Sequence, residues 1–193
     1  MTAPGTPPAN PVEVYDALET AIGEGRDDEQ QRVDALAKVE RAKDDGSAAY
    51  AFVRAALLGR VAELRGADAG KLVTEAEAWA RRSLERDPEY RERAATQMLG
   101  SLYVMAPGRL LEHGDSEDGL AMLEGLVEAK PAEPRYHLRL AQAYLHLGDD
   151  DAARPQLCAV LPARAQLRGD ERKLLDGLVG DAGGSGALGC AAQ

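Results

Sequence analysis

The sequence predicts an all-α protein made of antiparallel helical hairpins, and two observations lead to this prediction. Ala and Leu dominate the hydrophobic residues while only 4% of the chain is aromatic, a composition that favours closely packed helices over strands. Apolar residues also recur at helical spacing, most clearly in the stretch 133–162, where Leu138, Ala141 and Leu145 stand at i, i+3 and i+7. A Gly-Asp turn at Gly148 divides this stretch into two helices. The wide apolar face of the first one has to be buried against further hairpins.

The first two helices have clear start signals. Asn10 suits the N-cap, because its side chain accepts a hydrogen bond from a backbone N–H that the helix leaves free. Pro11 suits the first helical position, where its missing N–H is no loss. Gly23 is expected to end this helix. A second helix is expected over 27–43, after an acidic first turn.

The helical pattern continues through the centre of the chain. The most apolar segment, 48–65, is expected to lie near the middle of the protein. Further helices are expected over 72–86, after Asp87-Pro88, over 119–131, in the two halves of 133–162, and over 170–179. One connection departs from a regular hairpin, because residues 105–116 make a longer turn than paired helices usually need.

These signals describe one helical domain at residues 10–179. The proline-rich residues 1–9 are expected to form a disordered arm. Residues 180–193 contain five glycines and are expected to form a disordered tail.

A family resemblance rests on Leu140, Ala141, Tyr144, Gly148, Ala153 and Leu157. Their spacing is similar to that of the tetratricopeptide repeat (TPR), in which small residues let two helices approach and large ones fill the gap between them. Residues 119–131 resemble the second helix of such a repeat, with Gly119 where the family has alanine. The resemblance implies a right-handed superhelix of antiparallel helical hairpins, a TPR-like α-solenoid, with two to three repeats plus flanking capping helices.

A narrower resemblance rests on residues 106–115, with the sequence Ala-Pro-Gly-Arg-Leu-Leu-Glu-His-Gly-Asp. This turn, followed by a repeat, is similar to the turn in the TatT-type helical proteins that accompany TRAP transporters in bacterial periplasms. The likeness covers residues 48–162. It implies a role beside a solute-binding protein.

The composition argues against a nucleic-acid partner. The chain has 23 Lys and Arg against 33 Asp and Glu, a formal charge of −10, and a field of that sign repels phosphate backbones. The sequence also has no apolar run long enough to cross a bilayer. We therefore expect neither a nucleic-acid partner nor a membrane span.

No pattern indicates catalysis, a cofactor or a metal. His137 and His146 are too far apart on one helix to chelate a metal from one face. His113 is expected in a solvated loop. Cys158 has no base beside it in the sequence, and no glycine loop that could hold phosphate is present. We therefore expect a protein without enzymatic activity, cofactor or metal site.

The two cysteines are not expected to pair, because Cys158 lies on a helix and Cys190 in the glycine-rich tail. Cys190-Ala-Ala-Gln has the form of a prenylation box, but no basic cluster reinforces membrane attachment, and we do not expect prenylation of Cys190. The first ten residues lack the features of a secretory signal. The sequence as written therefore predicts a cytoplasmic location, and a periplasmic one if a signal segment was removed.

The repeat resemblance also implies a binding face, since the first helices of successive TPR hairpins line a concave groove. Hairpins are expected to begin at Phe52, Arg93 and Pro134. The groove positions counted from these starts give the expected partner-binding residues: Arg60, Glu63, Gln97, Ser101, Val104, Met105, Arg135, Leu138, Gln142, Leu145 and His146. This set mixes apolar and hydrogen-bonding groups, as a peptide groove should.

Two functions follow as hypotheses. The first is a scaffold or adaptor that binds a peptide, a helix, a subunit or a second copy of the chain in the concave groove. The alternative is a TatT-type accessory component of a bacterial solute transporter. A second candidate surface is the inserted turn at 107–116.

Overall fold

The computed structural model describes residues 10–190, which contain helices and no strand. The all-α prediction is confirmed. The expected arm at 1–9 and the last three residues of the tail lie outside the described residues. The α-helices are α1 (Pro11–Gly23), α2 (Glu29–Arg41), α3 (Ala48–Ala62), α4 (Gly70–Arg86), α5 (Tyr90–Met105), α6 (Ser116–Ala129), α7 (Pro134–Leu147), α8 (Asp150–Val160), α9 (Gly169–Asp181) and α10 (Ser185–Leu188). Short 3-10 helices are η1 (Gly66–Ala69), η2 (Gly108–Leu110) and η3 (Leu161–Gln166).

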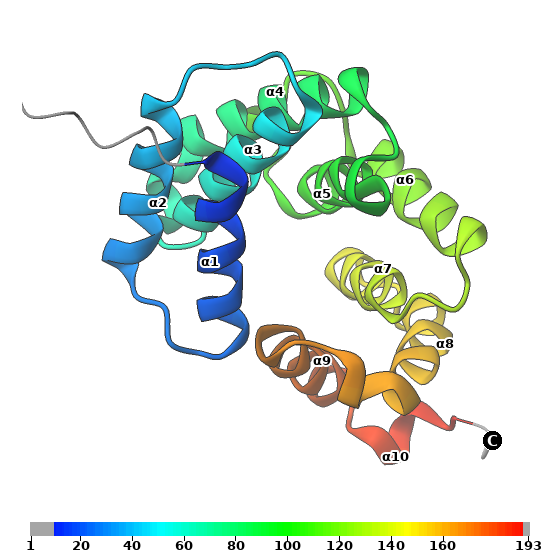
Figure 1. The fold of residues 1–193 in the computed structure, drawn as a ribbon. Coiled ribbons are helices and arrows are strands. Elements are labelled where there is room, and N and C mark those ends of the chain that lie inside the picture. The colour runs from blue at the N-terminus through cyan, green and yellow to red at the C-terminus, as the bar shows by residue number, and fades with distance from the viewer. Residues whose placement is uncertain (1–9, 191–193) are drawn as a thin grey trace, which may run out of the picture.

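Consecutive helices pair into hairpins. Helix α3 packs on α4, α5 on α6 and α7 on α8, and the first helices of these hairpins contact one another in the order α3, α5, α7. Helices α1 and α2 cap one end, and α9 packs on α7 at the other. The chain is thus an α-solenoid of three hairpins with capping helices. The array curves until α9 also contacts α1, so the solenoid closes into a ring (Figure 1).

The start signals act locally. The Asn10 side chain accepts a hydrogen bond from the Val12 N–H at 3.0 Å. Asp28 forms a capping box with Gln31 at the start of α2. Asp115 accepts two backbone N–H groups at the start of α6. Each bond satisfies a donor that the first turn leaves free, which fixes where the helix begins.

The buried core follows the ring. Nine of the 15 residues of α3 are buried, which makes this helix the centre of the amino-terminal half. The core continues through Leu99 of α5, Leu138 of α7 and Leu175 of α9, each 0% exposed. Buried apolar clusters therefore join each hairpin to its neighbours, as expected for stacked repeats.

Helix α5 starts with a left-handed turn. Arg91, Glu92 and Arg93 have φ angles of 46°, 57° and 64°, a region that costs L residues roughly 1–2 kcal/mol each because Cβ approaches the following carbonyl oxygen. Contacts from both neighbours hold the turn. Arg91 pairs with Asp16 of α1 at 2.8 Å, and the Tyr136 hydroxyl of α7 donates to the Glu92 carbonyl. The regular helix begins after Arg93, close to the expected hairpin start.

The carboxyl-terminal tail differs from the prediction of disorder at 180–193. Helix α9 extends into this segment, and α10 packs on α8 and α9 with Leu188 only 5% exposed. A disulfide joins Cys158 of α8 to Cys190, with their Cα atoms 5.5 Å apart. The expectation that the two cysteines do not pair is wrong, because the tail folds back onto the helix that carries Cys158.

Candidate functional site

The expected partner-binding residues lie on α3, α5 and α7, the first helices of the three hairpins. Helices α5 and α7 line the inner side of the ring, and α6 and α8 lie outside them (Figure 1). The predicted binding face is thus the inside of a closed ring. What a partner could reach there depends on how these side chains are already paired.

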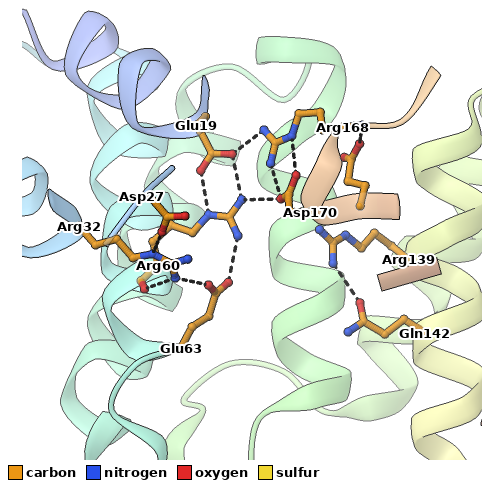
Figure 2. Close-up of polar contacts among 10 residues, drawn as sticks. Glu19, Asp27, Arg32, Arg60, Glu63, Arg139, Gln142, Arg168 and Asp170 are labelled. Atoms are coloured by element: carbon orange, nitrogen blue, oxygen red, sulfur yellow. Dashed lines mark hydrogen bonds and ion pairs between the residues drawn. The ribbon is translucent and has the colours of Figure 1, made fainter. Parts of the chain in front are cut away.

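Arg60 of α3 and Glu63, the residue directly after this helix, belong to an ion-pair network inside the ring (Figure 2). Arg60 Nε and Nη2 donate to the two carboxylate oxygens of Glu19 in α1 at 2.8 and 2.9 Å. Glu63 accepts from Arg60 at 3.1 Å and from Arg32 of α2 at 2.8 Å. Both predicted residues therefore engage charges of the amino-terminal helices.

The start of α9 completes the network. Arg168, the residue before α9, donates through Nη1 to Glu19 at 2.6 Å and through Nη2 to Asp170 at 2.6 Å. Arg60 Nη2 lies 3.6 Å from Asp170. The carboxylate of Glu19 thus joins the two ends of the ring (Figure 2).

Burial and ion pairing have opposite effects on the pKa values of Glu19 and Asp170. Burial raises the pKa of the Glu19 carboxyl, but the hydrogen bonds and charges of Arg60 and Arg168 outweigh burial and lower this pKa below its ordinary value. The pKa of Asp170 is lowered in the same way, since Arg168 and Arg60 outweigh the effect of burial. Both acids are therefore ionised at neutral pH, and the network consists of full ion pairs.

Gln142 of α7 has an internal partner. Arg139 Nη1 donates to the Gln142 side-chain oxygen at 3.0 Å. Burial lowers the pKa of the Arg139 guanidinium, and the positive charge of Arg60 lowers it further. Gln142 thus helps to satisfy a cation that lies deep inside the ring (Figure 2).

Two predicted residues have no exposed side chain for a partner. Val104 is 4% and Leu138 0% exposed. Val104 packs in a cluster with Leu140 of α7, and Leu138 packs in one with Leu175 of α9. Leu145 is partly buried against that second cluster. These three positions join neighbouring helices, because α7 packs beside α5 and α9 packs beside α7.

The remaining predicted residues are accessible. Gln97 and Ser101 of α5 are half-buried, and His146 is exposed. Met105, at the end of α5, is 38% exposed. The Arg135 side chain is 49% exposed and pairs with Glu133 at 2.8 Å. Accessible groups of the predicted set therefore lie on both α5 and α7.

The inserted turn before α6 is folded against α4. The carboxylate of Glu77, which is 1% exposed, accepts the backbone N–H groups of Glu112 and His113 at 2.8 and 3.0 Å. The Thr74 hydroxyl donates to the Leu110 carbonyl at 3.0 Å. The insertion is thus a fixed surface element on the second helix of the first hairpin.

Two clefts lie away from the predicted face. One of about 480 Å³ beside the inserted turn is lined by Arg81, Tyr103, His113, Asp118, Ala121 and Met122. The other, of about 460 Å³, lies between α1 and α2. Neither cleft is lined by a residue of the predicted groove, while His113 of the inserted turn lines the first.

Sequence reasoning missed Glu19, Arg168 and Asp170. The sequence does carry a signal for Glu19, because this charged residue stands between the apolar residues Leu18 and Ile22 of the first helix. The structure shows that Glu19 is 8% exposed, and a buried charge needs a partner. Nothing in the sequence indicates that this partner comes from the start of α9.

Comparisons with known proteins agree with this fold. The tetratricopeptide repeat family model matches residues 109–167, which include α6, α7 and α8. A solved structure of MamA from AMB-1, in crystal form P212121, is 19% identical, with 92% of this chain and 86% of that chain covered and a TM-score of 0.50. A search of curated proteins finds no match. The chain is a TPR-like helical repeat protein.

No helix within residues 10–190 combines the length and the apolar character that crossing a bilayer requires.

Proposed function

We propose that the protein is a non-enzymatic adaptor that binds a protein or peptide through the inner face of the helical ring. The observation that carries the proposal is the placement of α3, α5 and α7 side by side, since repeat scaffolds present binding residues on one continuous face. On α5, Gln97 and Ser101 offer hydrogen bonds, and Met105 offers an adaptable apolar contact. Inner residues that are already paired within the chain, such as Arg60, stabilise the arrangement of the helices and are not proposed to contact the partner.

The test starts by capturing the partner from the native host and identifying it by mass spectrometry. Its affinity is then measured for a triple variant on α5, Gln97→Ala, Ser101→Ala and Met105→Ala. Binding should weaken by about 1–3 kcal/mol in total, because truncation removes contacts at the centre of the face. Arg60 stays unchanged in this variant because its loss would also break the ion pair with Glu19.

A matched control is a variant of exposed acids on the outer helix α6, Glu117→Ala and Glu128→Ala, which should bind as the unaltered chain does. If the α5 variant binds normally and Glu112→Ala with His113→Ala abolishes binding, the inserted turn is the functional surface instead.

One observation favours the alternative, a TatT-type accessory protein of a bacterial solute transporter. The Cys158–Cys190 disulfide suits an oxidising compartment such as the periplasm, because cytosolic reductants keep thiols reduced. The chain isolated from its native host under thiol-blocking conditions should then contain the disulfide and co-purify with a solute-binding protein. Two free thiols in that sample would count against the periplasmic alternative.

A further inference from the structure

We propose that the contact between α1 and α9 is a clasp that controls access to the inner face of the ring. The clasp consists of Glu19 and Gly23 on the α1 side and Arg168, Gly169 and Asp170 on the α9 side. The inference rests on the proposed function only in taking the inner face as the binding surface. The opening of the clasp itself can be measured on the chain without any partner.

The backbones of the two helices touch at the clasp. A Cβ on Gly169 would lie 2.2 Å from the Gly23 carbonyl oxygen and 3.3 Å from its carbonyl carbon. Atoms that are not bonded cannot come this close, and the obstacle is backbone, which cannot turn aside as a side chain can. Only glycine at position 169 therefore allows the ring to close in this way.

The ion pairs across the clasp form an alternating square. Glu19 contacts both Arg60 and Arg168, and Asp170 contacts the same two arginines. Each side of the clasp also holds a complete pair of its own. Arg60 donates twice to Glu19 on the α1 side, and Arg168 donates twice to Asp170 on the α9 side. Opening the clasp thus leaves every charge of the square with a partner.

The apolar core does not seal the clasp. Leu18 and Ile22 of α1 belong to one buried cluster, which α1 shares with α2 and α3. Leu175 and Leu178 of α9 belong to another, which α9 shares with α7 and α8. Separating α1 from α9 therefore leaves both clusters intact, and little of the hydrophobic stabilisation of the fold opposes it.

The closed clasp covers charged groups of the inner face. The Arg60 side chain is 18% exposed and has its donors occupied by Glu19, Glu63 and Asp170. Arg139 of α7 is also partly buried, next to the same network (Figure 2). When α9 moves away, Asp170 leaves Arg60, and both guanidinium groups become accessible from the inside of the ring. The clasp is an autoinhibitory contact within the chain.

Arginine modification tests the clasp without any partner. The full chain is treated with phenylglyoxal, and the rate at each arginine is read by peptide mass spectrometry. Arg164 serves as the internal reference, since its side chain is 48% exposed and lies outside the clasp. In the unaltered chain, Arg60 and Arg139 should react more slowly than Arg164. In Gly169→Ala their rates relative to Arg164 should rise about tenfold, as the closed population falls, and the radius of gyration from small-angle X-ray scattering should increase.

Gly177→Ala is the matched control, because it makes the same change in α9 where a Cβ meets nothing within 4 Å. It should leave both rates and the scattering unchanged. Arg168→Gln is a second opening variant that adds no clash, for the case in which circular dichroism shows that Gly169→Ala does not fold. It should raise the same two rates.

Equal rates at Arg60, Arg139 and Arg164 in the unaltered chain would overturn the proposal. So would protected arginines and unchanged scattering in a folded opening variant. If the clasp opens as expected while the triple variant on α5 still binds the captured partner normally, the proposed binding face fails and the clasp stands.

Discussion

At the scale of single residues, two buried carboxylates illustrate two different structural roles. Glu77 is 1% and Glu19 8% exposed, and a buried carboxylate is stable only where donors surround it. The donors of Glu77 are the backbone N–H groups of Glu112 and His113, so this carboxylate organises a loop. The donors of Glu19 are guanidinium groups from α3 and from the start of α9, so this carboxylate joins distant helices.

The first prediction concerns Glu77→Ala. The change should lower the free energy of unfolding by about 3 kcal/mol, because two hydrogen bonds to a charged acceptor are lost and two N–H groups are left without it. Urea denaturation measures this loss. Limited proteolysis should also cut the inserted turn at 106–115 faster. Glu85→Ala, at an exposed position of the same helix, should change neither quantity, and equal effects of the two variants would contradict the anchoring role.

Side chains that act within one turn of their own helix could be predicted from the sequence. Asn10 and Asp115 cap helices through neighbouring N–H groups, so the local order of residues contains the whole interaction. The pairing of Glu19 with Arg168 joins residues 149 positions apart. It exists only because the ring closes, and no local pattern indicates it.

At the scale of elements, the close packing of α5 on α6 explains why Gly119 stands where the TPR family has alanine. A Cβ on Gly119 would lie 2.7 Å from the Gly100 carbonyl oxygen and 2.8 Å from Tyr103 Cβ. A Cβ on Gly100 would lie 3.0 Å from the Gly119 carbonyl oxygen. The two helices cross with their backbones in contact, and each needs the other's glycine.

The second prediction compares two glycine substitutions in α6. Gly119→Ala should destabilise the protein by about 1–3 kcal/mol, because the added methyl group forces the two backbones apart. Gly125→Ala, where a Cβ meets nothing within 4 Å, should instead stabilise it by up to about 1 kcal/mol through helix propensity. Thermal and urea denaturation give both values. If both substitutions changed the stability in the same direction, the close approach of α5 and α6 at Gly119 would not determine the effect of the added methyl group.

The tail shows where composition misled the sequence analysis. Five glycines suggest a segment that cannot bury enough surface to become ordered. Two single residues outweigh that composition. Leu188 inserts into the cluster of α8 and α9, and Cys190 bonds to Cys158. Since α8 was itself predicted, the missing information was only the direction in which the tail turns after α9.

The third prediction concerns the disulfide. Reduction should lower the free energy of unfolding by about 2–4 kcal/mol, because the unfolded chain regains the freedom of the loop between the two cysteines. Unfolding curves with and without a dithiol reductant measure the difference. The double variant Cys158→Ala with Cys190→Ala is the control and should be insensitive to the reductant. If the reductant leaves the stability of the unaltered chain unchanged as well, the disulfide does not contribute to the stability of the fold.

At the scale of the whole molecule, periodic sequence patterns determine each hairpin but not the curvature of the array. The pairing of α7 with α8 follows from residues at repeat spacing, and the family match at 109–167 reflects that regularity. Small rotations between hairpins accumulate along the solenoid. Their sum brings α9 to α1, where Arg168 pairs with Glu19. The sequence therefore indicates the helices that carry the predicted groove residues, but not that the array closes and pairs some of these residues internally.

The last prediction uses acid to measure what the ion pairs of Glu19 contribute to stability. The pKa of Glu19 is lower in the folded chain than its ordinary value of 4.5. Its pairing therefore contributes stability that is fully present above the ordinary value and is lost as the pH falls through the folded value. Glu19→Gln should cost about 3 kcal/mol at neutral pH, because Arg60 and Arg168 each lose a carboxylate partner that is itself largely buried.

In urea unfolding at a series of pH values, the difference between the unaltered chain and Glu19→Gln should stay constant down to about 4.5 and then shrink towards zero. Asp176→Asn is the control, since Asp176 pairs with Arg164 on the surface and has a side chain 55% exposed. Its effect should be small throughout, because water and salt screen exposed pairs. A Glu19→Gln difference that grows in acid would mean that the carboxyl is protonated more readily in the folded chain. Burial would then outweigh the two arginines, and the ion pairs of Glu19 would not stabilise the folded chain.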